Sequence, residues 1–227
     1  MLDWTKYEGR REVVAYPAKF SETRFGIPAL WEAVSKAEIL YRGWPFIYVD
    51  RNRDTRVVDD GLQTEVTLTH IRGHEYFETW RLLRSGLFFH RAVMDEDAYP
   101  PLAREGKVLG LETTVYHISE AIGSLWHLYA ALGVADTEFV TMTFTYDGVQ
   151  GRDLRIVSPS RAGFIGKQTC FVPKITCERG LPLGDWRASE VDLATDVCVE
   201  IFQQFQWIQP NLTSIRELAS GLLGKKR

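Results

Sequence analysis

The sequence predicts an α+β fold in which a mainly antiparallel sheet packs with two long helices and a helical C-terminus. Three observations predict this class. Apolar residues recur at helical spacing in two long segments and again near the C-terminus. Short runs of β-branched and aromatic residues lie between these segments, without strict alternation of strand and helix. No stretch rich in proline, serine or glycine divides the 227 residues. We therefore expect one domain over residues 27–227, preceded by an N-terminal arm over residues 1–26 that packs on a neighbour.

A first helix is expected over residues 28–43. Pro28 suits the first turn of a helix, where its missing N–H costs nothing, and Gly43 is a natural end. The apolar residues at helical spacing are Leu30, Trp31, Val34, Ala37 and Tyr41.

Three strands are expected next, over residues 45–50, 64–70 and 87–93. Each is a short β-branched or aromatic run bounded by turn residues. In the second run Val66 and Leu68 fall on one face and Thr67 on the other. This alternation is typical of an antiparallel sheet with one solvated face.

A second long helix is expected over residues 113–132, with Gly133 as the residue that follows its C-cap. Strict alternation over residues 139–146 predicts a strand. A turn should then pair this strand with residues 154–157 as a hairpin, and a further strand is expected over residues 169–175.

The C-terminal part is expected to be helical again. Ser189 is a candidate N-cap, with Asp192 three residues later in place of the usual glutamate. Pro210 and Asn211 then break the chain, and Asn211 should cap a short last helix.

The composition excludes several classes of protein. The formal net charge is −3, so no overall basic field attracts nucleic acid or an anionic membrane. The cysteines, Cys170, Cys177 and Cys198, are odd in number and too widely spaced for a disulfide framework or a metal knuckle. No run of about 18 apolar residues predicts a membrane span, and the N-terminal residues lack the pattern of a signal peptide. We therefore expect a cytoplasmic protein without membrane contact.

The histidines form no recognisable metal motif. His117 and Glu120 are neighbours on the second long helix, but His127 is offset from His117 by about 80° around an ideal helix. A metal ion needs several such side chains to converge. No GxSxG elbow occurs, and the GFIGK segment at residues 163–167 lacks the spacing of a phosphate-binding loop. We therefore expect no catalytic set, no metal and no cofactor.

An alternative rests on the acidic cluster Asp95, Glu96 and Asp97, which follows a strand. Clustered carboxylates can hold Mg²⁺ for phosphoryl transfer, although adjacent residues rarely all face one ion. With nearby arginines, this cluster would make the chain a small metal-dependent nuclease or a nucleic-acid-binding protein. A solvated acidic turn is the simpler interpretation.

Aromatic and basic residues interleave between positions 76 and 91. Exposed Trp and Arg side chains are favoured anchors of protein interfaces, and on a sheet face they can also stack on bases and contact phosphates. The candidate binding residues are Trp80, Arg81, Arg84 and Arg91. Core aromatics alternating with outward arginines are the plainer alternative, and a ligand pocket lined by tryptophans is a third.

One longer stretch, residues 77–97, reads FETWRLLRSGLFFHRAVMDED. It resembles the C-terminal region of bacterial ATP-binding proteins that carry a Schlafen-type AlbA_2 domain. In that region an aromatic-Trp-Arg segment, a turn glycine and an aliphatic-aromatic strand precede a short acidic ending. Further segments are similar in order: YRGWPFIYV (41–49), HISEAIGSLWHLYAALGV (117–134), TFTYDGVQGRDL (143–154) and CVEIFQQFQW (198–207).

The resemblance covers residues 40–210 approximately and leaves out the AlbA_2 module itself, so no active-site residue of the family carries over. It implies an accessory or sensing unit of a bacterial antiviral defence or regulatory complex, working with a separately encoded effector. This implication rests on the likeness to the family and not on the residues of a functional site. Together with the residue patterns, it leads us to predict a non-enzymatic recognition domain that binds a protein partner, with nucleic acid as the alternative partner.

Overall fold

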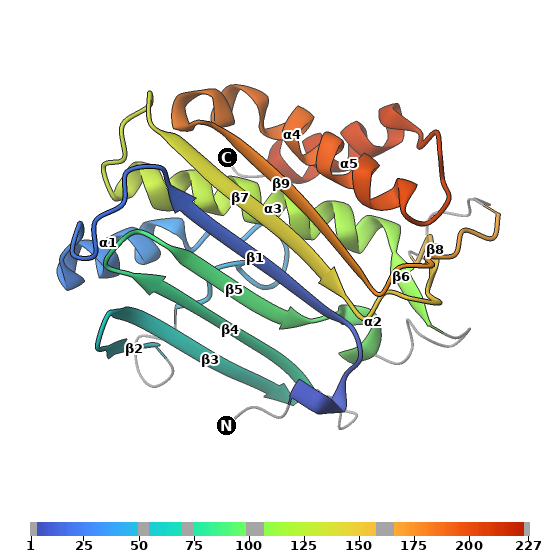
Figure 1. Cartoon of the computed structure of the whole chain (residues 1–227), viewed down its shortest axis with the longest axis horizontal. Coiled ribbons are helices and arrows are strands. Elements are labelled where there is room, and N and C mark those ends of the chain that lie inside the picture. Colours follow the sequence, from blue (N-terminus) through green and yellow to red (C-terminus); the bar gives the residue numbers. More distant parts are fainter. Residues whose placement is uncertain (1–3, 50–54, 70–74, 99–106, 158–165, 225–227) are drawn as a thin grey trace.

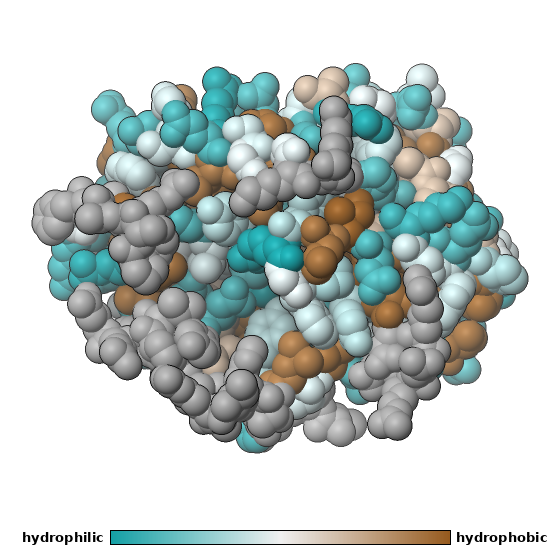
Figure 2. Space-filling view, turned by 180° about the vertical axis from the view of Figure 1, so that it is seen from behind, coloured by the Kyte–Doolittle hydropathy of each residue, from teal (hydrophilic) through white to brown (hydrophobic). Residues whose placement is uncertain are grey.

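A seven-stranded antiparallel sheet forms one layer of the computed structural model, which describes residues 4–49, 55–69, 75–98, 107–157 and 166–224. Helices cover one face of this sheet, and of the elements in these ranges the opposite face carries only a short 3-10 helix near the N-terminus (Figure 1). Seen from behind, hydrophobic residues on the helical side form small patches interrupted by hydrophilic residues (Figure 2). The predicted α+β class, with a mainly antiparallel sheet, is confirmed.

The strands of the large sheet follow the order β2-β3-β4-β5-β1-β7-β9. Their bounds are β1 (Arg10–Pro17), β2 (Thr55–Val58), β3 (Gly61–Thr69), β4 (Glu75–Leu83), β5 (Phe88–Val93), β7 (Phe139–Asp147) and β9 (Lys174–Pro182). Two short strands, β6 (Val108–Gly110) and β8 (Asp153–Arg155), form a separate parallel pair. The inward residues of the large sheet are mostly apolar and its outward residues mostly polar, as expected for a sheet with one solvated face.

The helical layer is built around one long central helix. The helices are η1 (Trp4–Lys6), α1 (Ile27–Ala37), α2 (Asp95–Ala98), α3 (Leu111–Ala131), α4 (Leu183–Gln203) and α5 (Leu212–Leu223). Because α3 contacts α1, α4 and α5, its side chains are buried almost all round. The inner face of the sheet and this layer share one continuous hydrophobic core.

Residues 10–17 correct the expectation of an N-terminal arm. They form β1, a central strand that pairs with β5 on one side and β7 on the other. Arg11, Val13 and Ala15 face inward and are buried. The period of two was obscured because its first inward residue is a charged arginine, which an apolar pattern does not register.

The expected strand over residues 45–50 is also absent from its described part, residues 45–49. This segment runs as coil, and Phe46, Ile47 and Val49 are buried in the core. Its backbone is held by a side chain, since Trp80 Nε1 donates to the carbonyl oxygen of Tyr48 at 2.7 Å. Hydrophobic burial therefore explains the apolar run without a strand.

The chain after β7 differs from the expected hairpin. Positive φ angles at Gly148 and Gly151 turn the backbone away from β7, and residues 153–155 pair with β6 instead. On the side of β7 away from β1, the paired strand is β9, which begins at Lys174, near the end of the strand expected over residues 169–175.

The two expected helix caps have opposite outcomes. Ser189 is not an N-cap but lies at a kink inside α4, where its hydroxyl donates to the carbonyl oxygen of Asp185 at 2.6 Å. Asn211 is the N-cap of α5, and its side chain accepts a hydrogen bond from the N–H of Ser214 at 3.1 Å. The positive φ of Gly133 after α3 agrees with the expected helix end.

A buried arginine ties the end of the sheet to the parallel pair. Both terminal nitrogens of Arg152 bond the Asp97 carboxylate at 2.7 Å, and Arg152 also donates to the carbonyl oxygens of Gly148 and Val108. Its side chain is 1% exposed. Asp97 also accepts from the N–H of Gly9.

Replacing this arginine should destabilise the fold strongly. We expect Arg152→Met to lower the free energy of unfolding by about 3–5 kcal/mol, because the partly buried Asp97 carboxylate would lose its cation and the carbonyl oxygens of Gly148 and Val108 would lose their donor. Urea denaturation followed by circular dichroism measures the change. The matched control is Arg10→Met, which removes a half-exposed pair with Asp147 and should cost less than about 1 kcal/mol. Equal losses in the two variants would contradict this account.

Candidate functional site

A cavity of about 420 Å³ lies between the inner face of the sheet, the segment after α1 and helix α3. It combines charged and aromatic side chains from regions that are distant in sequence. Its principal lining residues are Arg11, Arg42, Trp44, Glu78, His90 and His117.

Strand pairing brings the polar floor of the cavity together. Glu78 on β4 lies opposite Ala92 on β5, which in turn lies opposite Arg11 on β1. The next row inward along the strands holds Trp80 and His90 as direct partners. Because Ala92 carries a single side-chain carbon, the row leaves space between Glu78 and Arg11.

Arg11 is held by three acceptors at one end of the cavity. Its guanidinium donates to Asp95 at 3.0 Å, to the Tyr76 hydroxyl at 2.7 Å and to the carbonyl oxygen of Val93 at 3.2 Å. Burial by itself would raise the pKa of Asp95, but Arg11 and His117 hold it well below its ordinary value. Arg11 and Asp95 therefore form a paired, ionised unit.

His117 on α3 bridges two charged partners. Its Nε2 lies 2.8 Å from Asp95, and its Nδ1 lies 3.2 Å from Nη2 of Arg42. Since an arginine can only donate, Nδ1 must accept, and the proton sits on Nε2 and is donated to Asp95. Burial and the charge of Arg11 lower the pKa of His117 to about 3, despite the opposing effect of Asp95. With both ring nitrogens engaged, this histidine is not available as a base.

Arg42, in the segment after α1, is fixed by Glu120 on α3. The two side chains form a bidentate pair with distances of 2.6 and 2.7 Å. Burial raises the pKa of Glu120 although Arg42 opposes this. Bidentate geometry makes this pair rigid, so it positions the segment that carries Trp44.

Glu78 and His90 differ from the other polar residues of the cavity because their bonding is incomplete. Oε2 of Glu78 accepts from Trp44 Nε1 at 3.2 Å and from the Tyr76 hydroxyl at 3.1 Å. Oε1 has no hydrogen-bond partner among the described residues, and neither ring nitrogen of His90 has one. The closest approach, from His90 Nε2 to Glu78 Oε1, is 3.6 Å. Both residues are 2% exposed, and an unsatisfied buried polar group costs about 1–3 kcal/mol.

The lining of the cavity offers charged, hydrogen-bonding and aromatic groups to a bound molecule. The described lining contains no serine, threonine or cysteine, and burial raises the pKa of Tyr76 well above its ordinary value, so its phenol stays protonated. Within the part of the chain that the structure describes, no group of three or more His, Cys, Asp or Glu residues could hold a metal ion.

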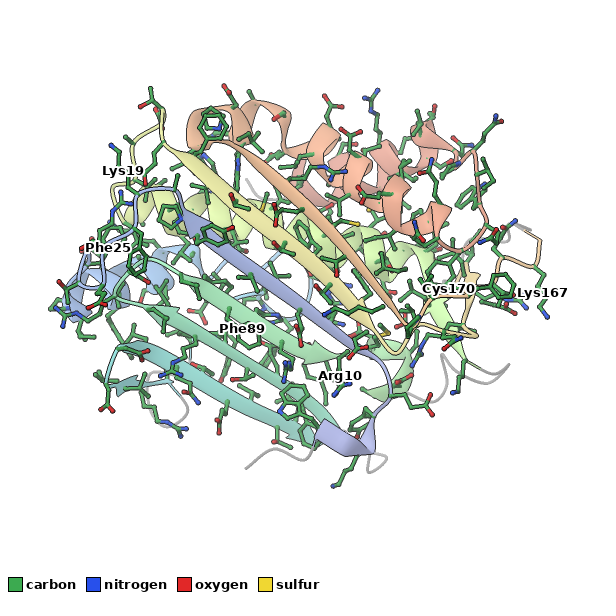
Figure 3. The ribbon with its side chains drawn as sticks, in the orientation of Figure 1. Arg10, Lys19, Phe25, Phe89, Lys167 and Cys170 are labelled. Carbon is green, nitrogen blue, oxygen red and sulfur yellow. The ribbon has the colours of Figure 1, made fainter. Side chains whose placement is uncertain are left out.

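The four residues expected to bind a partner do not form one surface. Trp80 faces inward and is fully buried. Arg81 pairs with Asp60 at 2.6 Å, and Arg84 donates to the backbone at Phe25. Arg91 lies on the outward face, paired with a glutamate and about 5 Å from two aromatic rings. Phe89, one of these aromatic residues, is labelled on the open face of the sheet in Figure 3.

The acidic cluster at residues 95–97 is divided among three tasks. Asp95 bonds Arg11 and His117. Glu96 accepts from the N–H of Gly110 at 2.9 Å and from Thr113 at 2.6 Å, so it is anchored at the start of α3. Asp97 pairs with Arg152, as described above. The nuclease hypothesis requires the three carboxylates to converge on one metal ion. Their separate partners show that they do not.

Comparisons with known proteins add no relative. No protein-family model, no curated protein and no solved structure matches this chain. None of the helices in the described ranges is both long enough and apolar enough to cross a membrane.

The position of His117 makes the stability of the fold sensitive to acid. Between its ordinary value of 6.5 and its folded pKa of about 3, the unfolded state binds a proton that the folded state refuses. Stability should therefore fall as pH is lowered through this window, by up to about 1.4 kcal/mol per pH unit. The His117→Gln variant, in which this proton uptake is absent, should show a shallower loss from pH 6.5 to 4.

Denaturation in urea at several pH values measures this difference, and NMR reads the histidine directly. The ring signals of His117 should stay constant from pH 7 to 4 while the neighbouring charges, Arg11, Arg42, Asp95 and Glu120, keep their pairing. Titration of His117 near pH 6.5 would contradict the assigned tautomer and its hydrogen bonds.

Proposed function

We propose that this chain is a small-molecule-binding recognition domain whose ligand occupies the cavity between β4, β5, α3 and the segment carrying Trp44. The observation that carries the proposal is the incomplete bonding of Glu78 and His90 in an otherwise fully paired polar wall. Buried polar groups in folded proteins are nearly always satisfied, and exceptions require an explanation. A ligand that bonds these atoms explains the exception.

The form of the cavity supports this proposal. Its volume falls within the range of about 300–1,000 Å³ that is typical of small-molecule sites. Aromatic rings form part of its wall, with Trp44 stacked on Tyr48 at 4.2 Å and Phe46 lying 4.5 Å from the ring of His90. Apolar walls with a few fixed polar groups are the usual composition of such sites.

A second function, the binding of a protein partner, is favoured by a different surface. Tyr16, Phe20 and Phe139, which we name the aromatic end patch, are 39%, 77% and 53% exposed. The patch lies where β1 ends, because the N–H of Ala18 bonds the carbonyl oxygen of Phe139 at 2.8 Å. Lys19 and Phe25 mark this end of the sheet in Figure 3. Exposed aromatic side chains are frequent anchors of protein interfaces.

The two functions combine in one role. We propose a sensing unit that binds a small molecule in its cavity and a protein at the aromatic end patch. The resemblance to the companion region of AlbA_2-domain proteins suggests a separately encoded effector of a bacterial defence or regulatory complex as that protein. Nucleic acid is the alternative partner.

Filling the cavity should abolish ligand binding. We expect Leu68→Trp to occupy the space beside Glu78 without removing a polar group, since Leu68 lines the cavity from β3. The measurement is native mass spectrometry of the protein after incubation with small molecules extracted from its host. The wild type should retain an added mass that Leu68→Trp loses.

The matched control is Val57→Trp, which introduces the same side chain at a position that is 60% exposed on β2. This variant should bind as the wild type does. A ligand retained equally by all three proteins, or by none, would contradict the proposed cavity site.

Altering the aromatic end patch should remove the protein partner. We expect the double variant Phe20→Ser, Phe139→Ser to lose a partner that the tagged wild type recovers from its host at native expression, with proteins and nucleic acids both identified. The control is Phe171→Ser, at another exposed aromatic position. Recovery of nucleic acid without protein would favour the alternative, and an unchanged partner in the double variant would place the interface elsewhere.

A further inference from the structure

We infer that the ligand of this cavity is a compact organic cation, an amine whose N–H groups donate to Glu78 and whose apolar body lies against Trp44. This inference rests on the proposed function and specifies its ligand. Three properties of the cavity carry it: its charge balance, the direction of the missing hydrogen bond and its aromatic wall.

The charges that line the cavity leave one carboxylate without an arginine partner, and its one ion-pair contact among the described residues is with His90 Nε2 at 3.6 Å, which is charged only when that ring is protonated. Two arginines face three carboxylates, and each arginine is already matched, Arg11 by Asp95 and Arg42 by Glu120. With histidine counted as neutral, the lining carries a net charge of −1, and the unmatched carboxylate is Glu78. Its two existing donors, Trp44 and Tyr76, are neutral groups. A cation completes this balance.

The oxygen Oε1 of Glu78 lacks a hydrogen-bond donor among the described residues. An ionised carboxylate oxygen only accepts, so the free Oε1 requires an N–H or O–H from the ligand. A bond between a charged donor and a carboxylate is roughly twice as strong as a bond between neutral groups. An ammonium group also leaves further N–H donors that can reach the unpaired ring of His90.

The aromatic side chains provide the remaining contact area. A cation over the face of Trp or Tyr gains about 0.5–2 kcal/mol, depending on how well it is desolvated. Trp44 has its N–H directed to Glu78 and its ring stacked on Tyr48, so the charge and the ring face belong to one site. Arg42 of the cavity lining is itself held over an aromatic ring, 5.3 Å from the ring centre of Tyr116, which lies outside the lining.

An anionic ligand fits these observations poorly. It would have to compete with Asp95 or Glu120 for an arginine, and it would lie beside the unpaired oxygen of Glu78. Like charges in a shielded site repel strongly. The cavity therefore selects against the negatively charged analogue of the same ligand.

The test uses three probes that share one ring and differ in charge: 2-phenylethylamine, 2-phenylethanol and 3-phenylpropanoate. These probes have no indole, so changes in tryptophan fluorescence report the protein. We expect the amine to bind saturably, to change the fluorescence and to raise the melting temperature. The anion should have none of these three effects.

Variants assign the binding to the site. Glu78→Gln keeps the shape of the side chain and removes its charge, and it should weaken binding of the amine at least tenfold. Trp44→Leu should weaken binding several-fold through loss of the ring face. The control is Glu65→Gln, the same change at a half-exposed glutamate on β3, and it should bind the amine as the wild type does. Circular dichroism and melting temperature establish that each variant is folded.

The outcomes separate this inference from the proposed function. Tighter binding of the anion or the alcohol, blocked by Leu68→Trp, would overturn the cation and leave the cavity as a ligand site. A second result would also overturn the cation and leave the cavity as a ligand site. In that result no probe binds, but the wild type retains a host molecule that has no basic nitrogen, and Leu68→Trp loses it. If no probe binds and no host molecule is retained, both proposals fail.

Discussion

The pairing of three consecutive carboxylates at the end of β5 fixes the arrangement of the elements around the cavity. Asp95 holds Arg11 of β1 and His117 of α3, Glu96 accepts hydrogen bonds from Gly110 and Thr113 at the start of α3, and Asp97 binds Arg152. An ionised group taken out of water must be paired, or the fold loses several kcal/mol. Each carboxylate can be satisfied only if its partner element is in place, so the position of α2 determines those of β1, α3 and the turn that precedes β8.

The incomplete bonding of Glu78 is informative because the surrounding charges are so thoroughly paired. Arg11, Asp95 and Arg42 are all paired within the same cavity. The unpaired oxygen of Glu78 could likewise be avoided, either by an additional arginine or by an apolar residue in place of Glu78. Retaining a buried unpaired oxygen costs stability. Local departures from good bonding are expected where function requires them, and Glu78 and His90 are such a departure inside a cavity large enough to hold a small molecule.

Elements with a strong hydrophobic period were predictable, and the site was not. The 3.6-residue period identified α3 and also α1, although α1 ends at Ala37 and not at Gly43 as expected. Alternation identified β3 and β7, and a β-branched and aromatic run identified β5, because these patterns are local. By contrast, β1 begins its inward face with Arg11, and residues 45–49 are apolar without forming a strand. Glu78 and His90 become neighbours only through the pairing of β4 with β5, which no spacing in the sequence encodes. A usable signal existed: each shares its inward face with a large aromatic residue, Trp80 or Phe88, where a charged or polar residue is unusual.

The two proposed binding surfaces are connected by a short length of chain. Phe20 of the aromatic end patch lies in the segment that leads into α1, and Trp44 and Arg42 lie in the segment that leaves it. The central strands are a poor route between the sites, because each is paired on both sides and tightly packed. Helix α1 has fewer constraints, since it contacts the rest of the fold mainly through α3 and β3. In the proposed role, a ligand held between Glu78 and Trp44 contacts the segment that leaves α1, and the segment carrying Phe20 leads into the other end of this helix. If the proposed ligand and partner influence each other, the coupling requires a second position of α1 relative to α3 that both of them favour or disfavour.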